Sequence, residues 1–268
     1  MLIKRVLSAL VILPLFVAAL LLLTSAHWSL FLLLILLMGA WEWATLAHWP
    51  LWAIVLYVLG TAACGLWIQW FNGASPSIDV FTPTLLVSLF FWFVVAPLWL
   101  KRGCTRVHPL LLALTGWVVL LPLWLSLVRL QSHPLLLLAI AAVIWISDTA
   151  AYGCGKRWGK RKLAAHISPG KTWEGFLGAM VAISVYYGVL YVVYASVWPP
   201  MSFGMGLGVV VLMGILGVEG DLFESWIKRV AGVKDSGFIL PGHGGLLDRI
   251  DALCPSMPLA ALIFSSYY

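Results

Sequence analysis

The stretch H-P-L-L-L-A-L-T-G-W-V-V-L-L-P-L-W-L-S-L-V, residues 108–128, decides the fold class, because its 21 residues include no acid, lysine or arginine. A bilayer core about 30 Å thick is crossed by a helix of about 20 apolar residues, which is the length of this stretch. Similar apolar stretches cover residues 6–24, 28–48, 50–71, 80–100, 134–153, 173–196, 204–227 and 250–267. The sequence therefore predicts an all-α, polytopic transmembrane protein with about nine spans.

The composition of the whole chain agrees with this class. Of the 268 residues, 63% are hydrophobic and only 10% are charged, whereas a soluble domain has about 25% charged residues. This excludes a soluble or disordered protein. In a membrane protein the formal net charge of +6 is first a signal of topology, and we do not expect a nucleic-acid partner.

The basic residues predict the orientation. With nine spans, fifteen of the sixteen Lys and Arg residues fall in loops on one side, and only Arg129 lies opposite. Because Lys and Arg are enriched on the cytoplasmic side, this predicts a cytoplasmic N-terminus and an external C-terminus. The lack of a transit peptide or soluble extension favours the bacterial inner membrane.

Acidic residues concentrate in the second half. All ten acids except Glu42 and Asp79 lie between Asp148 and Asp251. Because ionisable groups within spans are costly, their retention indicates a function. We therefore expect a scaffold of about five spans over 1–133 and a catalytic region over 134–268, with cytoplasmic loops at 154–172 and 228–249.

The first polar cluster begins with Asp148 and continues into a basic run over 156–162. Such a run is typical either of an anchor beside anionic lipid or of a surface that gathers phosphate-bearing substrates.

The second polar cluster covers 166–175. Ser168-Pro169-Gly170 predicts a turn, and Ser168 or Thr172 would cap the helix that follows. Lys171 beside a helix N-terminus is suited to binding phosphate. Glu174 is either part of the site or an acid that the first helical turn favours.

The third cluster is the most informative. If residues 221–229 are helical, Asp221, Glu224, Ser225 and Lys228 stand on one face. The glycine-rich segment P-G-H-G-G, residues 241–245, lets backbone amides approach an anion.

Two further carboxylates complete this cluster. Asp248 and Asp251 are three residues apart at the start of the last apolar stretch. Carboxylates with interspersed Lys and Arg suit Mg²⁺ and a polyphosphate. The alternative is an ion-pair network with a purely structural role.

Three segments resemble the phosphatidate cytidylyltransferases, the CDP-diacylglycerol synthases. Residues 225–251 read S-W-I-K-R-V-A-G-V-K-D-S-G-F-I-L-P-G-H-G-G-L-L-D-R-I-D and are similar to the signature of that family. S-D-T-A-A-Y-G at 147–153 and S-P-G-K-T-W-E-G at 168–175 resemble other family segments. Ala252 departs from the pattern, where the family has a small hydroxyl residue.

The resemblance implies a membrane enzyme that makes CDP-diacylglycerol and pyrophosphate from CTP and phosphatidate. It implies a divalent cation, Mg²⁺ or Mn²⁺, and a homodimer. The metal ligands that it implies are Asp221 and Asp248, followed by Asp251 and Glu224.

On this basis we assign further roles. The expected catalytic residues are Asp221, Asp248, Lys228, Arg229, Lys171 and His243. The expected substrate contacts are Lys234, Arg249, Gly244, Gly245, Ser225, Asp148 and Glu174. His243 either donates to pyrophosphate or fixes the turn, and Asp148 either joins the metal ligands or orients a lysine.

Other classes of membrane protein also fit some of these features. Intramembrane acids and lysines occur in transporters, although the chain has no internal repeat that favours one. Another lipid-phosphate transferase, such as a prenyl-phosphate glycosyl-1-phosphate transferase or a CTP-dependent lipid kinase, would also use acids and metal. Only the match over 225–251 separates these enzymes from a cytidylyltransferase.

Overall fold

The structure is a computed structural model that describes residues 13–74, 79–103, 107–194, 197–237, 244–265 and 267. A short helix, Leu13–Leu22, comes first among these residues. The first half then contains α2 (Ser25–Leu46), α3 (Leu51–Ala74), α4 (Phe81–Phe90), a π-helical turn η1 (Phe91–Val95), α5 (Ala96–Arg102) and α6 (Pro109–Leu130). The second half contains α7 (Pro134–Trp158), β1 (Lys162–Ala164), β2 (Ser168–Thr172), α8 (Trp173–Val193), α9 (Phe203–Val230), α10 (Leu247–Ile250) and α11 (Leu253–Phe264).

Seven helical segments within the described ranges are long and apolar enough to cross a membrane. The chain is therefore a mostly helical, multi-pass membrane protein, as the sequence predicts. The first and last of the nine expected spans correspond to shorter helices, Leu13–Leu22 and Leu253–Phe264. The count of nine and the orientation of the termini remain predictions.

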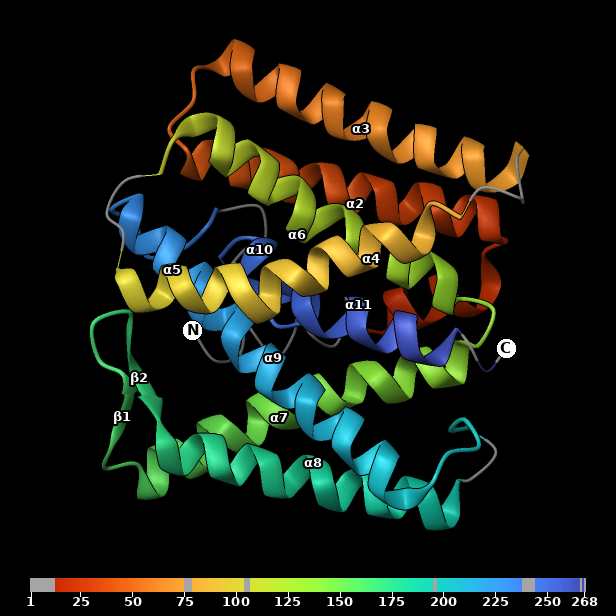
Figure 1. Cartoon of the computed structure of the whole chain (residues 1–268), viewed down its shortest axis with the longest axis vertical. Helices are drawn as coiled ribbons and strands as arrows, with labels where there is room; N and C mark the ends of the chain where they lie inside the picture. The colour runs from red at the N-terminus through yellow and green to blue at the C-terminus, as the bar shows by residue number, and fades with distance from the viewer. Residues whose placement is uncertain are drawn as a thin grey trace.

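Helix α11, in the last of the nine expected spans, is short and packed within the protein. Its 12 residues extend only about 18 Å at 1.5 Å per residue, less than the thickness of a bilayer core. It packs against α6, α9, α4 and α7, and it lies in the middle of the helical assembly (Figure 1). Its apolar side chains are therefore buried by protein.

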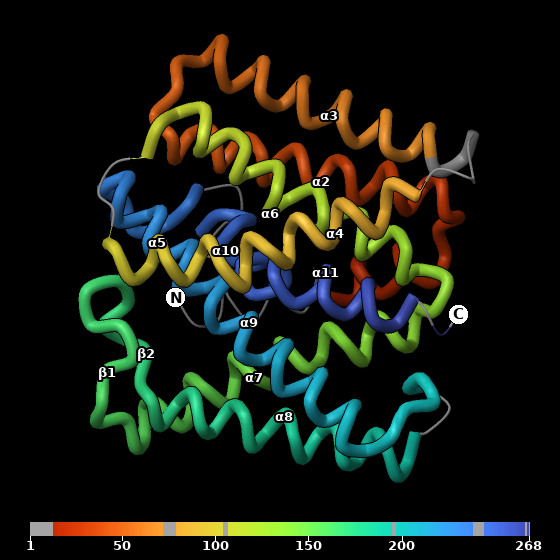
Figure 2. Tube along the Cα trace, viewed as in Figure 1, coloured from red at the N-terminus to blue at the C-terminus, as the bar shows by residue number. Residues whose placement is uncertain are grey.

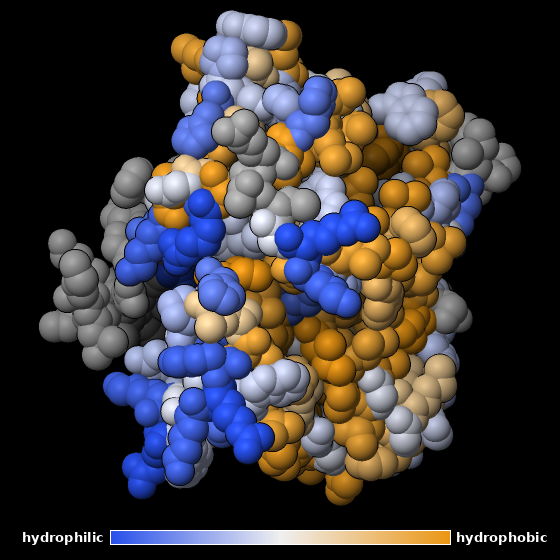
Figure 3. Space-filling view, turned by 60° about the vertical axis from the view of Figure 1, so that its left-hand side comes forward, coloured by the Kyte–Doolittle hydropathy of each residue, from blue (hydrophilic) through white to orange (hydrophobic). Residues whose placement is uncertain are grey.

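The long helices run roughly side by side, so their connections gather at two ends of the molecule (Figure 2). The turn between α2 and α3, the end of α5, the start of α6, the β-hairpin and the C-terminal end of α9 lie at the same end (Figure 1). The basic loops of the sequence are thus brought together. Figure 3 shows hydrophilic side chains clustered beside a wide apolar surface, as expected where a membrane protein meets water.

The segment 154–172 differs from the loop that we expected. Helix α7 continues to Trp158, and β1 and β2 then form an antiparallel hairpin that pairs Lys162 with Thr172. Ser168-Pro169-Gly170 lies in β2 instead of forming a turn. Thr172 caps α8, as one of the two sequence alternatives predicts, because its Oγ1 accepts a hydrogen bond from Gly175 N at 3.2 Å.

Proline and aromatic residues shape the helix that runs from α4 to α5. Pro97 has no N–H group and its ring crowds the preceding turn, which explains why the helix widens into η1 just before it. Phe91 and Trp92 of this turn pack edge-on against Phe223 of α9, with ring centroids 5.3 and 5.4 Å apart. These contacts support α9 where its polar residues begin.

Helices α7 and α8 approach closely through small residues. A Cβ atom added to Gly175 would lie 2.7 Å from the carbonyl oxygen of Ala151, and one added to Gly178 would lie 2.4 Å from Cys154 Sγ. Small residues allow such close backbone approach between membrane helices. This contact positions the hairpin and Lys171 relative to α7.

We expect Gly175→Ala to destabilise the protein by roughly 1–3 kcal/mol, because the added methyl group meets backbone atoms that cannot move away cheaply. Gly188→Ala is the matched control on the same helix, since no described residue lies within 4 Å of its added Cβ. That substitution should be neutral or stabilise by up to about 1 kcal/mol through helix propensity. Thermal unfolding in one detergent measures both, and equal shifts in Tm would contradict the close packing of α7 on α8.

Candidate active site

Helix α9 carries the predicted polar stripe. Its 28 residues include 221–229, so Asp221, Glu224, Ser225 and Lys228 share one helical face, as predicted. Glu224, Ser225 and Lys228 are buried, whereas Asp221 is partly exposed. The stripe therefore has a buried part and a part that is open to a ligand.

The buried part is a cluster of two carboxylates and one lysine. Lys228 Nζ forms ion pairs with Glu224 Oε2, one turn away on α9, and with Asp248 Oδ1 of α10. The three side chains are only 10%, 9% and 13% exposed. We expected Lys228 to contact phosphate, but in the structure its ammonium group lies between these two carboxylates.

The other oxygen of Asp248 is also occupied. Asp248 Oδ2 accepts hydrogen bonds from Ser236 N and Ser236 Oγ, both at 3.1 Å, and from Gly245 N at 2.8 Å. Burial raises the pKa of Asp248, but the bonds from Lys228 and Gly245 outweigh this, so its pKa is lowered. Gly245 was expected to offer its amide to phosphate, whereas here that amide binds Asp248.

The segment before α10 requires glycine at one position. Gly244 has φ of +81°, in the left-handed region, and an added Cβ would lie 2.8 Å from Asp248 Oδ2. Glycine at position 244 therefore allows the backbone to pass close to the carboxylate of Asp248. His243 lies outside the described residues.

The more open part of the site is a lysine–aspartate pair. Lys171 Nζ of β2 lies 2.9 Å from Asp221 Oδ2 and donates to Val218 O at 3.2 Å. Their side chains are 20% and 38% exposed. Ser225 Oγ donates to Asp221 Oδ1 at 3.4 Å, and Asp148 of α7 interacts electrostatically with both members of the pair. The structure thus brings together residues of all three sequence clusters.

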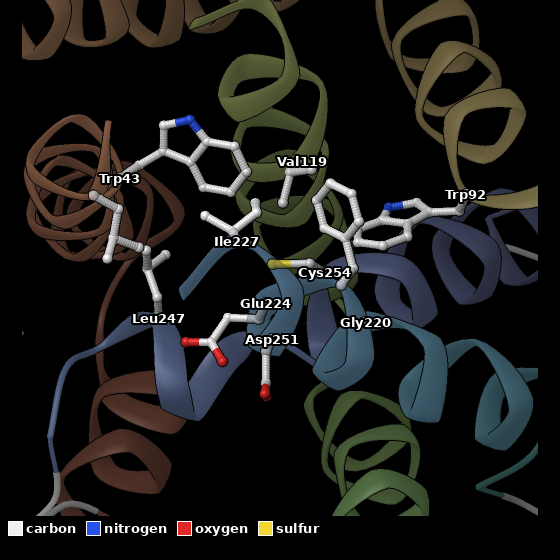
Figure 4. Close-up of a pocket in the computed structure, with 11 residues that line it drawn as sticks. Trp43, Trp92, Val119, Gly220, Glu224, Ile227, Leu247, Asp251 and Cys254 are labelled. Atoms are coloured by element: carbon white, nitrogen blue, oxygen red, sulfur yellow. The ribbon is translucent and has the colours of Figure 1, made fainter. Parts of the chain in front are cut away.

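Asp251 interacts electrostatically with both parts of the site, through Asp221 and Glu224. Its carboxyl group is buried and follows directly after α10. Glu224 and Asp251 both line a small cavity whose other walls are apolar (Figure 4). The carboxylate of Asp251 points away from the indole rings of Trp43 and Trp92 in this view. Such surroundings strengthen electrostatic interactions.

The other expected site residues lie around this centre. Glu174 accepts hydrogen bonds from Lys160 N at 3.0 Å and Arg161 N at 3.2 Å, so it holds the start of the hairpin. Arg229 donates to Val233 O at 3.2 Å. Lys234 and Arg249 are exposed. The structure therefore shows a local structural role for Glu174. Its expected contact with substrate stays a prediction.

Sequence reasoning missed Glu42. This buried acid of α2 accepts hydrogen bonds from Ser236 Oγ at 3.1 Å and from Leu246 N and Leu247 N, both at 2.9 Å. One signal was available, because an acid within an apolar span is costly and needs a partner. Its partners are about 200 residues away in the sequence, and no local pattern identifies them.

The described residues contain no group of three or more His, Cys, Asp or Glu side chains arranged closely enough to hold a metal ion. The carboxylates of Asp148, Asp221, Asp251 and Glu224 nevertheless act on one another electrostatically. Glu224 Oε1 is buried without a hydrogen-bond partner among the described residues. Oxygen donors of this kind are those that Mg²⁺ prefers.

The fold and the site together define a class of protein. It is a multi-pass membrane protein whose carboxylates and lysines form ion pairs at one end of an apolar helical assembly. Comparison with known proteins is more specific. The model of the family described as the cytidylyltransferase family matches residues 3–267. The chain therefore belongs to the cytidylyltransferase family, whose members are nucleotidyltransferases.

Several relatives carry the name phosphatidate cytidylyltransferase. The protein of that name from Pseudomonas aeruginosa is 35% identical over 99% of this chain and 98% of its own length. One from Staphylococcus aureus is 45% identical over 45% of each chain. One from Brucella suis is 46% identical over 46% of this chain and 43% of its own.

Proposed function

We propose that this protein is a phosphatidate cytidylyltransferase, which converts CTP and phosphatidate into CDP-diacylglycerol and pyrophosphate. The observation that carries the proposal is the match to the Pseudomonas aeruginosa enzyme, which extends over almost the whole of both chains. The site agrees with this reaction, because it combines Lys171, a cation suited to phosphate, with carboxylates suited to a metal cation.

The chemistry needs little proton transfer. The phosphomonoester of phosphatidate has a second pKa of about 6, so it is largely a dianion near neutral pH and needs no strong base. One of its oxygens attacks the α-phosphorus of CTP and forms the new P–O–P bond. The bond between the α-phosphorus and its bridging oxygen to the β-phosphate breaks, and pyrophosphate leaves with that electron pair.

Electrostatic repulsion is the main barrier, because an oxyanion must approach a highly charged triphosphate. Lys171 is the cation best placed to meet phosphate, since it is held by Asp221 in the more open part of the site. Lys234 and Arg249, which are exposed, would bind the outer phosphates. Lys228 and Glu42 would act indirectly, by holding Asp248.

We further propose Mg²⁺, or Mn²⁺, as the cofactor, held by Asp221 and Asp248 with Asp251 and Glu224. The hard oxygen donors fit, and so does the buried Glu224 Oε1 that lacks a partner among the described residues. When bound, the cation would neutralise phosphate charge. Because both oxygens of Asp248 are engaged here, Asp221, whose side chain is 38% exposed, is more accessible than Asp248 or Glu224.

The surroundings of the reaction follow from its substrates. CTP is soluble and phosphatidate stays in the bilayer, so the site would open both to the cytoplasm and sideways to lipid. We propose nine spans with a cytoplasmic N-terminus and an external C-terminus in a bacterial inner membrane. We also propose a homodimer. The shared end of the basic loops (Figure 1) supports the site's cytoplasmic exposure.

The experiment is the conversion of radiolabelled phosphatidate to CDP-diacylglycerol in detergent micelles. We expect product that requires CTP and Mg²⁺ and is lost when EDTA removes the metal, then restored by Mg²⁺ or Mn²⁺. Arms with ATP and with a lipid alcohol test other transferases and lipid kinases. Well-folded protein that makes no CDP-diacylglycerol under any of these conditions would contradict the proposal.

A further inference from the structure

We infer that Glu42 of α2 is a positioning residue for the proposed reaction: its carboxylate holds Ser236 and the start of α10, and through them sets the position of Asp248. This inference rests on the proposed function, and it adds a residue from the first half of the chain to the catalytic machinery of the second.

Glu42 is placed where a carboxylate is costly. Its residue is only 2% exposed, and burying a charged side chain is costly unless hydrogen bonds compensate. The donors that the described structure gives it are all uncharged. Such a carboxylate is retained only if these hydrogen bonds offset its burial.

Both oxygens of Glu42 contribute to holding α10. Oε1 accepts from Leu246 N and Oε2 accepts from Leu247 N, each at 2.9 Å. Amides at the start of a helix have no partner within the helix. The N-cap residue of α10 is Leu246, whose side chain makes no capping hydrogen bond. Glu42, 204 residues away in the sequence, therefore caps this helix.

Two glycines leave room for this carboxylate. A Cβ atom on Gly237 would lie 2.6 Å from Glu42 Oε1, and one on Gly245 would lie 2.6 Å from Glu42 Oε2 and 2.0 Å from Ser236 Oγ. Side chains at these positions would therefore displace Glu42 or Ser236. The segment on either side of residues 238–243 is thus shaped around the Glu42 carboxylate.

Ser236 links Glu42 to the ion-pair cluster. Its Oγ lies 3.1 Å from Glu42 Oε2 and 3.1 Å from Asp248 Oδ2. Because a hydroxyl group has one proton, Ser236 donates to one carboxylate at a time. Its backbone N–H donates to Asp248 Oδ2 at the same time. A shift of Ser236 would therefore move Asp248 relative to Lys228.

The experiment compares Glu42→Gln and Ser236→Ala with the control Asp79→Asn, in full-length protein in detergent. Glu42→Gln keeps the shape but turns one acceptor oxygen into an N–H₂ donor that faces other donors. Asp79 is the matched control, because it also accepts bonds from amides at a helix start, Phe81 N and Thr82 N, but is exposed and uses no residue of the site.

Two measurements test the inference separately. Amide hydrogen exchange in the peptide covering 244–251 should rise in Glu42→Gln and stay unchanged in Asp79→Asn; this needs no enzymatic activity. In the assay, each of Glu42→Gln and Ser236→Ala should lower kcat and raise the Mg²⁺ concentration that gives half-maximal activity. For each variant we expect the two effects combined to be 10- to 100-fold, as for other substitutions of residues that orient a metal ligand. The KM for CTP should change less.

Each outcome bears on one claim. Unchanged exchange at 244–251 in Glu42→Gln would overturn the positioning of α10. A variant that only melts earlier, with wild-type kcat per folded molecule and wild-type Mg²⁺ dependence, would reduce Glu42 to a stabilising role and overturn the inference. Failure of the wild-type protein to make CDP-diacylglycerol would instead overturn the proposed function, and with it the catalytic part of this inference.

Discussion

Lys228→Met is expected to destabilise the protein by roughly 3–5 kcal/mol, because it leaves Glu224 and Asp248 buried without their shared cation. Methionine keeps most of the length of the side chain, so the loss of charge dominates over any cavity. We also expect the CDP-diacylglycerol activity to fall below detection, since Asp248 loses the ion pair that fixes its Oδ1. The measurements are thermal unfolding in detergent and the phosphatidate assay.

The control for this prediction is Lys234→Met. Lys234 is exposed and near in sequence, so its loss should change stability by no more than about 1 kcal/mol. A second variant separates stability from catalysis. Adding Glu224→Gln to Lys228→Met removes one of the two unpaired charges, and it should recover part of the lost stability without restoring activity. An unchanged Tm for Lys228→Met would show that the buried ion-pair cluster is not formed.

Local patterns in the sequence predicted the parts of the site that depend on local geometry. The stripe of Asp221, Glu224, Ser225 and Lys228 follows from helical periodicity alone, and α9 has it. The cap at Thr172 was one of two predicted alternatives for the same reason. Apolar stretches likewise predicted the seven long helical segments among the described residues.

Contacts between distant segments could not be predicted in this way. The charges of Lys228 and Asp248 suggested phosphate and metal binding, but their pairing depends on how α10 packs against α9. Glu42 was assigned to the scaffold because it is far from the other acids in sequence, yet α2 brings it to Ser236. Hydropathy also predicts a ninth span at 250–267, but hydropathy does not distinguish lipid from a protein interior, and the helix found there, α11, has 12 residues.

The two ion-pair groups differ in a way that separates stability from function. Lys228, Glu224 and Asp248 are at most 13% exposed, whereas Asp221 is 38% and Lys171 is 20% exposed. A partly exposed pair contributes only about 0–1 kcal/mol to stability. It is also the pair that a substrate phosphate or a cation can reach. We therefore expect variants of the open pair to affect catalysis much more than folding.

Asp221→Asn should lower kcat by at least about a hundredfold, the order of loss when one electrostatic group is removed from an active site, while Tm changes little. If Asp221 is a metal ligand, the variant should also need more Mg²⁺ for half-maximal activity, because an amide oxygen binds the cation less strongly than a carboxylate. Ser225→Ala serves as a graded comparison: it removes only the hydroxyl that donates to Asp221 Oδ1, so its effect should be in the same direction and smaller. Activity and Mg²⁺ titrations on folded protein test both variants. A low kcat with wild-type Mg²⁺ dependence would mean that Asp221 serves Lys171, 2.9 Å away, and does not hold the metal.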